Sequence, residues 1–413
     1  MGEHSVLYKK VGIATAIGRR TRLEFREIHS KGEDFLVDLK SLDWVQLWKS
    51  DFIRKVIQTD KPLSLEKAQF SLTEPQLIDH DKFLTSIREN LPTDLSQQIS
   101  LTLSGVLYLV SAMFWSVALD EEDLLPFKIV LSSELSVGAG TGSSASFSVA
   151  LSSAIYHYIK LKASSKFGTG MHNISAPGFA PCTLDLLPVY SGFSKVDKDI
   201  INKWAYCIEK VMHGKPSGLD NTVCTFGGAV VINANPTDSK VPNFELLESL
   251  PSLRVVLVNS KVPRNTAVLV KKVANLYALC PAAMDSVLNS MDTVAKEFIR
   301  LLQKLQCEIN FGKNTELVYS QLEGLMDIQQ GLLTSIGVSH IRLDEICHLG
   351  QAKNLHFKLT GAGGGGFAFA LIPPNAAKEM VDQCLLDLEA NGFQVQQVDI
   401  NAKGLELSNL VES

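Results

Sequence analysis

Residues 134–144 form a glycine-rich segment between a strand-like run and a helix-like run, and this segment constrains the fold more than any other part of the chain. It carries three glycines at alternate positions, followed by two serines. Alternate glycines let backbone N–H groups approach an anion without interference from Cβ atoms, and the positive end of the helix dipole faces the same point. Ser143 and Ser144 can cap that helix. The segment therefore predicts a site for nucleotide phosphates.

The two best-known glycine-rich nucleotide loops do not fit this segment. A Walker A loop requires Gly-Lys-Ser/Thr, and no lysine follows these glycines. A dinucleotide loop has the spacing Gly-x-Gly-x-x-Gly and an acidic residue about 20 positions later. Here the spacing is Gly-x-Gly-x-Gly, and residues 144–160 contain no Asp or Glu. A plain tight connection before a helix is the structural alternative.

A second glycine-rich segment lies at residues 358–366, directly before a strand-like run at 367–372. Five of the six residues 361–366 are glycine. As a mere linker inside a folded domain, this composition would be costly in conformational entropy. The segment therefore predicts a close approach of backbone to another group.

A third segment supplies carboxylates. Residues 199–214 repeat apolar side chains at helical spacing, which predicts an amphipathic helix that ends at Gly214. Glu209 lies at the edge of its buried face, where a carboxylate needs either a salt-bridge partner or a metal ion. The turn residues at 215–221 follow, and they predict that Asp220 projects from a loop.

Taken in order, the three segments resemble the motifs of the GHMP small-molecule kinases, most closely those of the mevalonate kinase family. The resemblance includes Ile-Asn-Lys-Trp-Ala-Tyr at 201–206 and Asn-Ser-Lys-Val-Pro-Arg-Asn-Thr at 259–266, and it extends over residues 2–393. It implies an α+β fold with a ribosomal-protein-S5-like domain at 1–240, a ferredoxin-like domain at 241–400 and a tail at 401–413. The active site would lie in the cleft between the two domains.

The resemblance also implies a reaction, the ATP-dependent phosphorylation of (R)-mevalonate at its 5-hydroxyl in isoprenoid and sterol precursor synthesis. Asp220 would orient the hydroxyl and accept its proton. Ser144 and Glu209 would hold Mg²⁺. The implied ATP contacts are Val137, Gly138, Ala139, Gly140, Thr141, Gly142, Ser143, Ser144, Gly363 and Gly364. The implied mevalonate contacts are Glu3, His4, Ser217 and Thr266.

Further expectations from the resemblance concern partners and location. They are a homodimer, feedback inhibition by prenyl diphosphates, and a cytoplasmic location with the peroxisome as the alternative. Two other functions stay open. One is a different GHMP kinase, acting on phosphomevalonate, galactose or homoserine, and the other is a binding protein that holds ATP without turnover.

The start of the chain departs from the family pattern. The family's first motif is a strand of the form Pro-Gly-Lys-x-x-Leu-x-Gly-Glu-His, whereas this chain opens with Met1-Gly2-Glu3-His4. The strand and its lysine, which the family places near the γ-phosphate, have no counterpart here. Loss of that cation would slow phosphoryl transfer. A truncated and catalytically impaired isoform is therefore the alternative to an active kinase.

Bulk properties narrow the class of protein. The chain has 413 residues, 46% of them hydrophobic, which predicts two to three domains with large cores. A formal charge of −5 argues against a nucleic-acid partner. Seven cysteines without a Cys-x-x-Cys pair favour neither zinc nor disulfides.

The pattern along the chain predicts several elements. The uncharged stretch 95–119 reads as a core helix and not as a membrane span, because polar residues interrupt it. We further expect strands within 12–37 and at 126–134 and 255–258, and helices at 144–160 and 282–307. Residues 163–188 are expected to form a mobile loop, and a polar break at 235–243 separates the domains.

Overall fold

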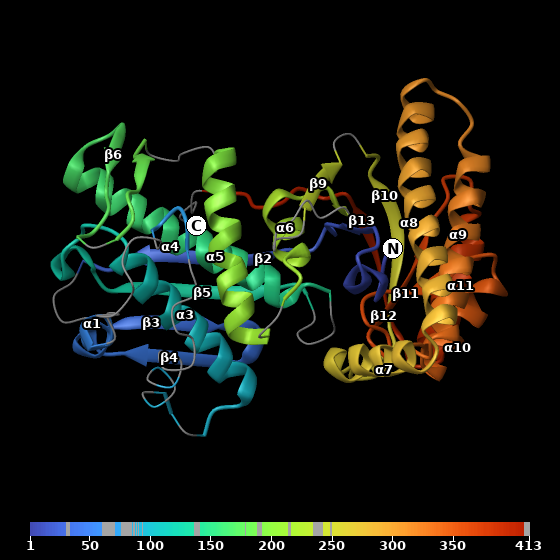
Figure 1. The fold of residues 1–413 in the computed structure, drawn as a ribbon, viewed down its shortest axis with the longest axis horizontal. Helices are drawn as coiled ribbons and strands as arrows, with labels where there is room; N and C mark the ends of the chain where they lie inside the picture. Colours follow the sequence, from blue (N-terminus) through green and yellow to red (C-terminus); the bar gives the residue numbers. More distant parts are fainter. Residues whose placement is uncertain are drawn as a thin grey trace. The chain divides into compact units, whose positions relative to one another are not determined.

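The computed structural model describes the whole chain except residues 30–33, 60–70, 76–84, 86, 88, 90, 93, 136–140, 178, 188–191, 214–215, 234–242, 248–249 and 409–413. The chain forms two compact units, here called unit 1 and unit 2 (Figure 1). Unit 1 comprises residues 1–19, 136–141 and 226–404, and unit 2 comprises residues 20–135, 142–225 and 405–413. Contacts, and not sequence order, define these units, so the boundary at residue 240 stays a prediction.

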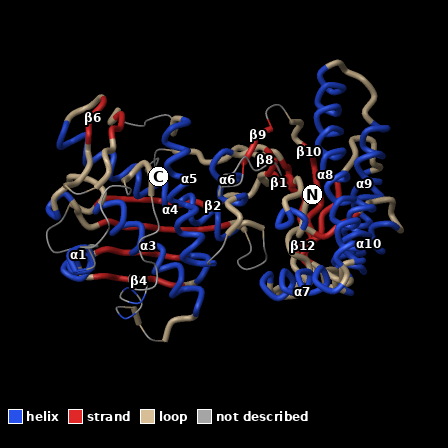
Figure 2. Tube along the Cα trace, in the orientation of Figure 1, coloured by secondary structure: helices blue, strands red, loops and turns tan. Residues whose placement is uncertain are grey.

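Unit 2 is built on a four-stranded sheet. Its strands, in spatial order, are β2 (Thr21–Glu27), β5 (Phe127–Ser133), β3 (Phe35–Leu39) and β4 (Trp44–Trp48). Only the β3–β5 pair is parallel. The helices are α1 (Ser50–Thr59), α3 (Gln97–Trp115), α4 (Ser143–Phe167), α5 (Lys195–His213) and α6 (Leu219–Phe226), with short 3₁₀ turns at Lys40–Leu42 and Glu121–Asp123. Helices α3, α4 and α5 pack against one another and share one core with the sheet (Figure 2).

Helix α3 is long and apolar enough to cross a membrane by length and composition, but it is buried inside unit 2. The expectation of a core helix is confirmed. Its hydroxyls satisfy themselves locally, because Thr102 Oγ1 donates to the Gln98 carbonyl at 2.9 Å and Ser104 Oγ donates to the Ser100 carbonyl at 2.7 Å. These bonds remove the cost of burying polar groups in a helix interior.

The expected loop at 163–188 is wrong at both ends. Helix α4 continues to Phe167, and β6 (Met171–Asn173) pairs with β7 (Thr183–Asp185) in an antiparallel ladder. Leu184 of β7 and Ile174, which directly follows β6, are buried, so the hairpin is anchored by packing that its Ser- and Gly-rich composition does not reveal.

Unit 1 contains two antiparallel sheets. One has the order β1 (Gly12–Thr15), β8 (Ala229–Asn233) and β9 (Asn243–Leu247), and the other has the order β11 (Phe357–Leu359), β12 (Phe367–Leu371), β10 (Leu253–Asn259) and β13 (Gln394–Ile400). The helices are α7 (Thr266–Leu279), α8 (Pro281–Asn310), α9 (Glu316–Ser335), α10 (Ile341–Gln351) and α11 (Lys378–Ala390), and a 3₁₀ turn spans Ser5–Tyr8. The expected strands and helices in the described part of this unit are confirmed. Most of the expected polar break lies outside the described residues.

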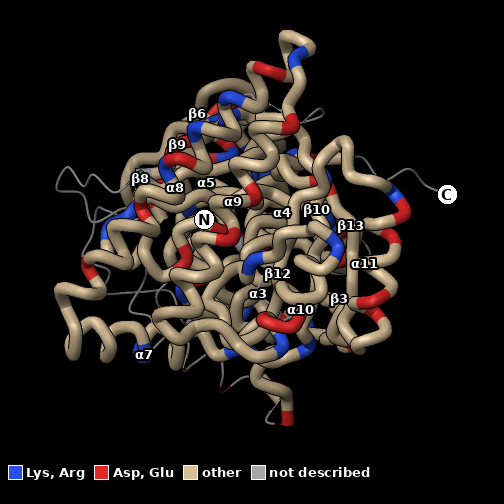
Figure 3. The backbone as a smooth tube through the Cα atoms, turned by 90° about the vertical axis from the view of Figure 1, so that its right-hand side faces the viewer, with Lys and Arg blue, Asp and Glu red and all other residues tan. Residues whose placement is uncertain are grey.

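Charged residues in unit 1 are rare on the central strands β10 and β12 and frequent on the outer helix α11. Strands β10 and β12 carry one charged residue between them, Arg254. Acidic residues follow one another along α11, whose buried side chains are apolar or thiol (Figure 3). Because they carry almost no charge, β10 and β12 can be buried on both faces, where two clusters of apolar side chains form the core of the unit.

Candidate active site

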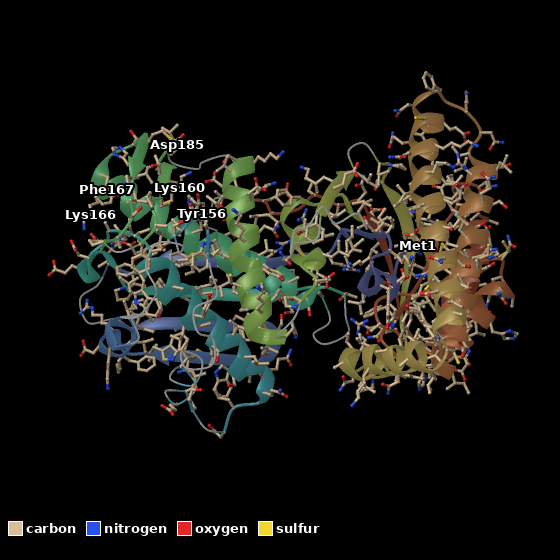
Figure 4. All side chains as sticks on the ribbon, in the orientation of Figure 1. Met1, Tyr156, Lys160, Lys166, Phe167 and Asp185 are labelled. Carbon is tan, nitrogen blue, oxygen red and sulfur yellow. The ribbon has the colours of Figure 1, made fainter. Side chains whose placement is uncertain are left out.

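Helices α4 and α5 run antiparallel in unit 2 and are joined by polar contacts near both ends. At one end, Tyr156 and Lys160 on α4 (Figure 4) contact the Asp197 carboxylate at 2.7 and 3.0 Å. Burial alone would raise the pKa of Asp197, but hydrogen bonds from Ser194, Tyr156 and Lys160 lower it. This buried ion pair fixes the start of α5 against α4. It thereby sets the position of every later α5 residue along the helix axis.

At the other end, two serines of α4 hold Glu209 of α5. Ser144 Oγ donates to Glu209 Oε1 at 2.5 Å, and Ser148 Oγ donates to the same oxygen at 2.9 Å. Glu209 is only 6% exposed. Its pKa is raised, chiefly by burial and further by the charge of Asp220, while the two hydroxyls and His213 oppose the shift. The pair proposed from the sequence to bind metal, Ser144 and Glu209, is therefore in direct contact.

Sequence reasoning missed two residues of this cluster. Ser148 is the second donor to Glu209, and His213 Nε2 lies 2.9 Å from Ser144 Oγ. Each lies one helical turn after a residue that was identified, since Ser148 follows Ser144 by four positions and His213 follows Glu209 by four. That spacing was the signal available in the sequence.

The start of α4 differs from the expectation in its cap. Gly142 takes the N-cap position with a left-handed φ of 79°, and no side chain caps the helix. The prediction that Ser143 and Ser144 cap α4 is wrong, because both lie inside the first turn and Ser144 donates to Glu209 instead. Thr141 Oγ1 is buried with no hydrogen-bond partner among the described residues. Val137, Gly138, Ala139 and Gly140 lie outside the described residues.

Asp220 does not project from a loop as expected. It is the second residue of α6, and it is exposed. Ser217 precedes this helix and accepts a hydrogen bond from the Leu219 N–H at 3.2 Å, while the Asn221 amide donates to Asn202 Oδ1 on α5 at 2.6 Å. The turn residues at 216–218 thus serve as the helix start, and a contact to α5 fixes the orientation of α6.

In unit 1, Glu3 and His4 lie beside the second glycine-rich segment. Glu3 Oε1 accepts a hydrogen bond from Lys358 Nζ at 2.5 Å, and both side chains are buried. Burial alone would raise the pKa of Glu3, but the Lys358 ammonium and, more weakly, the Met1 amino group at 3.9 Å lower it to about 2. His4 Nε2 lies 2.8 Å from the Ala362 carbonyl oxygen. Both predicted substrate contacts are therefore tied to residues 358–362.

The expected close backbone approach at residues 361–366 is confirmed. Gly363 has φ +78°, and a Cβ there would lie 2.1 Å from the Val338 carbonyl oxygen. The Gly364 N–H donates to that carbonyl at 2.8 Å. Leu269 of α7 packs against Gly364, which brings the helix that begins at Thr266 onto the loop, with Thr266 itself exposed. The groups that approach are the protein's own, so the roles of Gly363 and Gly364 toward ATP stay predictions.

The α4–α5 cluster suits a hard cation. Within the described part of the chain, no group of three or more His, Cys, Asp or Glu side chains has the arrangement of a metal site. Magnesium bound to phosphate needs only one or two protein oxygens, however. Burial and the like charge of Asp220 raise the pKa of Glu209 more than the two hydroxyls and His213 lower it, so its negative charge is only partly balanced, and a bound Mg²⁺ would balance it. Ser144 and Glu209 therefore fit the ion.

Two family models match this chain, GHMP kinases N terminal domain at residues 108–171 and GHMP kinases C terminal at residues 316–385. Mevalonate kinases of Mus musculus and Homo sapiens are each 32% identical to it, over 98% of this chain and 91% of theirs. The Arabidopsis thaliana mevalonate kinase is 30% identical, over 98% and 96%.

Solved structures agree on the fold. The Methanococcus jannaschii mevalonate kinase aligns with a TM-score of 0.63 at 20% identity, over 96% of this chain and 93% of its own. The L. major mevalonate kinase in complex with R-mevalonate aligns with a TM-score of 0.62 at 19% identity, over 98% and 94%. The α+β, two-domain GHMP kinase fold predicted from the sequence is confirmed. With relatives above 30% identity over nearly its full length, the chain belongs to the mevalonate kinase family of GHMP kinases.

Proposed function

We propose that this chain transfers the γ-phosphoryl group of ATP to the 5-hydroxyl of (R)-mevalonate, giving 5-phosphomevalonate and ADP for isoprenoid and sterol precursor synthesis. One observation carries the proposal, the 32% identity to mevalonate kinases over 98% of the chain. The cluster of Ser144, Glu209 and Asp220 in unit 2 supports it, because a hydroxyl, a buried carboxylate and an exposed carboxylate are what a phosphoryl-transfer site requires.

Asp220 is the proposed catalytic residue. Phosphoryl transfer depends on positioning and on electrostatic stabilisation more than on covalent chemistry by the protein. The Asp220 carboxylate orients the 5-hydroxyl and accepts its proton as the O–P bond forms. The contact from Asn221 to Asn202 holds the helix start that carries Asp220 against α5.

The start of α4 is the proposed phosphate site. The positive end of the 25-residue helix α4 lies at Gly142 and Ser143. Residues 137–144 together with Gly363 and Gly364 are the proposed ATP contacts. Ser144 and Glu209 would hold Mg²⁺, which would neutralise charge on the phosphate oxygens. Ser148 keeps the Glu209 carboxylate oriented through its hydrogen bond.

The remaining proposals concern mevalonate, assembly and location. Glu3, His4, Ser217 and Thr266 are the mevalonate contacts. The protein is a homodimer in the cytoplasm, and prenyl diphosphates inhibit it. Size-exclusion chromatography and inhibition by a prenyl diphosphate against varied ATP test the assembly and the inhibition.

An assay of ADP release with mevalonate, phosphomevalonate, galactose and homoserine tests the function. Turnover is expected with mevalonate alone. Asp220→Asn should lower kcat by about 100-fold or more, because the proton acceptor is lost, while the affinity for ATP is kept. Asp199→Asn, an exposed carboxylate on α5, is the matched control and should retain full turnover. Nucleotide binding without turnover on any of the four substrates would contradict the proposed function.

A further inference from the structure

Lys358 is a fully buried lysine that the proposed reaction leaves unexplained. Its side chain is 0% exposed. The ammonium donates to Glu3 Oε1 at 2.5 Å and to the Leu359 carbonyl at 2.6 Å, and it lies 5.1 Å from the centre of the Phe369 ring. Apolar residues of similar volume often replace a buried ion pair without loss of stability. Stability alone therefore does not account for this lysine.

The partner of Lys358 is held from two directions. Gln329 of α9, itself fully buried, donates from Nε2 to Glu3 Oε2 at 3.3 Å, while Lys358 on β11 binds Oε1. Both carboxylate oxygens are engaged, and each keeps a second lone pair for another donor. The position of Glu3 is therefore set by α9 and β11 together.

The turn that carries Glu3 is strained. His4 has φ +58°, a region that a residue with a side chain rarely adopts, and Gly2 has φ +100°. Such a conformation persists only where the surroundings hold it, and it is commonest at functional sites. Here the anchors are Glu3 on Lys358 and His4 on the Ala362 carbonyl.

The anchor at Ala362 also defines the His4 ring. A carbonyl oxygen only accepts hydrogen bonds, so His4 Nε2 carries the hydrogen in the 2.8 Å contact. The other ring nitrogen, Nδ1, is buried and has no hydrogen-bond partner among the residues that the structure describes, and the whole residue is 5% exposed. A buried polar atom without a partner is suited to a ligand's polar group.

We propose that Lys358, together with Gln329, is a positioning residue for the phosphoryl acceptor. Through Glu3 it holds the Gly2–His4 turn in its strained form, so that His4 keeps Nε2 on Ala362 and presents Nδ1 to the substrate. Lys358 touches no reacting atom in this arrangement. The inference rests on the proposed function, which assigns Glu3 and His4 to the acceptor.

Steady-state kinetics of Lys358→Met in the full chain tests this, with ATP and mevalonate varied separately and rates expressed per folded molecule. We expect kcat/KM for mevalonate to fall about 10- to 100-fold, since a displacement of about 1 Å has such an effect, while KM for ATP changes little. Gln329→Met should act in the same direction and more weakly. Lys353→Met, which breaks a half-buried ion pair with Asp387 in the same unit, is the matched control and should change neither constant.

The double variant Glu3→Gln/Lys358→Met distinguishes positioning from an independent effect. Because Lys358 acts through Glu3, the double variant should be no slower than the worse of the two single variants. Multiplying effects would overturn the proposal. So would a Lys358→Met protein that melts earlier but keeps its kcat/KM for mevalonate. If Lys358→Met does not fold, unchanged kinetics of Gln329→Met overturn it equally.

A readout without turnover separates this inference from the proposed function. In protein labelled with ¹⁵N-histidine, the His4 ring should show one tautomer, protonated at Nε2, and Lys358→Met should convert it to a mixture. An unchanged His4 signal in that variant overturns the positioning role. A wild-type chain that releases no ADP with mevalonate, yet shows this change, would refute the proposed function and leave the positioning role standing.

Discussion

Two buried glutamates, Glu3 and Glu209, differ in the groups that surround their carboxylates. Glu3 faces the Lys358 ammonium, and its pKa is lowered to about 2 although burial opposes this. Glu209 faces two hydroxyls, a histidine and the like charge of Asp220, and burial raises its pKa. The Glu3 charge is balanced by a buried lysine, whereas the two hydroxyls and His213 offset the burial of Glu209 only in part, which suits Glu209 to bind a metal ion. The two glutamates are the same residue type, and their charged surroundings alone distinguish their roles.

Glu209→Gln tests the metal role at this scale. The change removes the charge that a Mg²⁺ ion would neutralise, so the Mg²⁺ midpoint of turnover should rise about tenfold or more. The metal-free protein should not lose stability, because the buried charge was unfavourable there. Asp199→Asn on the same helix is the control. An unchanged Mg²⁺ midpoint would make Glu209 a structural residue only.

Glu3→Gln tests the ion pair through its pH dependence. A carboxyl whose pKa falls from 4.5 to about 2 on folding contributes about 3 kcal/mol above pH 4.5, and this contribution disappears as the pH falls toward 2. The free energy of unfolding should therefore differ most between wild type and Glu3→Gln at pH 7, and the difference should shrink from pH 4.5 downward in urea titrations. Glu297→Gln, in a surface pair with Arg300, should change the free energy little at any pH. A difference that is independent of pH would show that folding does not lower the pKa of Glu3.

Among the elements, the second glycine-rich segment and the α4–α5 pair place the site residues. The segment gains its shape from backbone contacts to Val338 and Val262, and glycine is required because the chain passes with positive φ at contact distance. Helix α4 carries Ser144 and Ser148 one turn apart, so a single face meets Glu209 of α5. Each element presents its chemistry only because a neighbour fixes its register.

Gly363→Ala tests the glycine requirement. Its positive φ alone should cost about 1–3 kcal/mol, and the overlap with the Val338 carbonyl should add to this. Gly324→Ala is the matched control, since Gly324 lies exposed on α9 with open space around it, and that change should stabilise the protein by about 0.5–1 kcal/mol. Chemical denaturation measures both. Equal stability of Gly363→Ala and wild type would show that the loop has other conformations available.

The whole molecule consists of two units with separate cores. One apolar cluster fills unit 2 around α3, and two others fill unit 1, each with alternate residues of β10 and with part of α8. Each unit combines segments that are distant in the sequence. Local opening should therefore follow the units and not the order of the chain.

Paired core substitutions test this independence. Leu107→Ala in α3 and Leu322→Ala in α9 each remove a fully buried side chain and should cost about 2–5 kcal/mol in their own unit. Hydrogen exchange followed by mass spectrometry should then accelerate mainly in the unit that carries the change. Each variant serves as the control for the other. Equal acceleration in both units by either variant would show that the chain unfolds as one cooperative body.

Local chemistry made much of the fold and part of the site predictable. The helix predicted at 282–307 lies within α8 (Pro281–Asn310), because its apolar spacing is a property of consecutive residues. Glu209 could be placed at the edge of a buried face for the same reason. The family resemblance then supplied roles for Ser144, Glu209 and Asp220 that periodicity does not contain.

Tertiary structure alone decided the partners of those residues. Lys358 lies 355 positions from Glu3, and no local pattern joins them, yet their contact sets the charge of a buried carboxyl. The same holds for the β6–β7 hairpin, which packing supports against its composition. It also holds for the start of α4, where Gly142 takes the cap position and Ser144, inside the first turn, donates to Glu209. The sequence by itself determined where helices, strands and glycine turns lie, since these depend on neighbours along the chain. Whether a carboxylate such as Glu3 or Glu209 has its charge balanced depends on its burial and on its distances to other charged groups. Only the folded chain defines that burial and those distances.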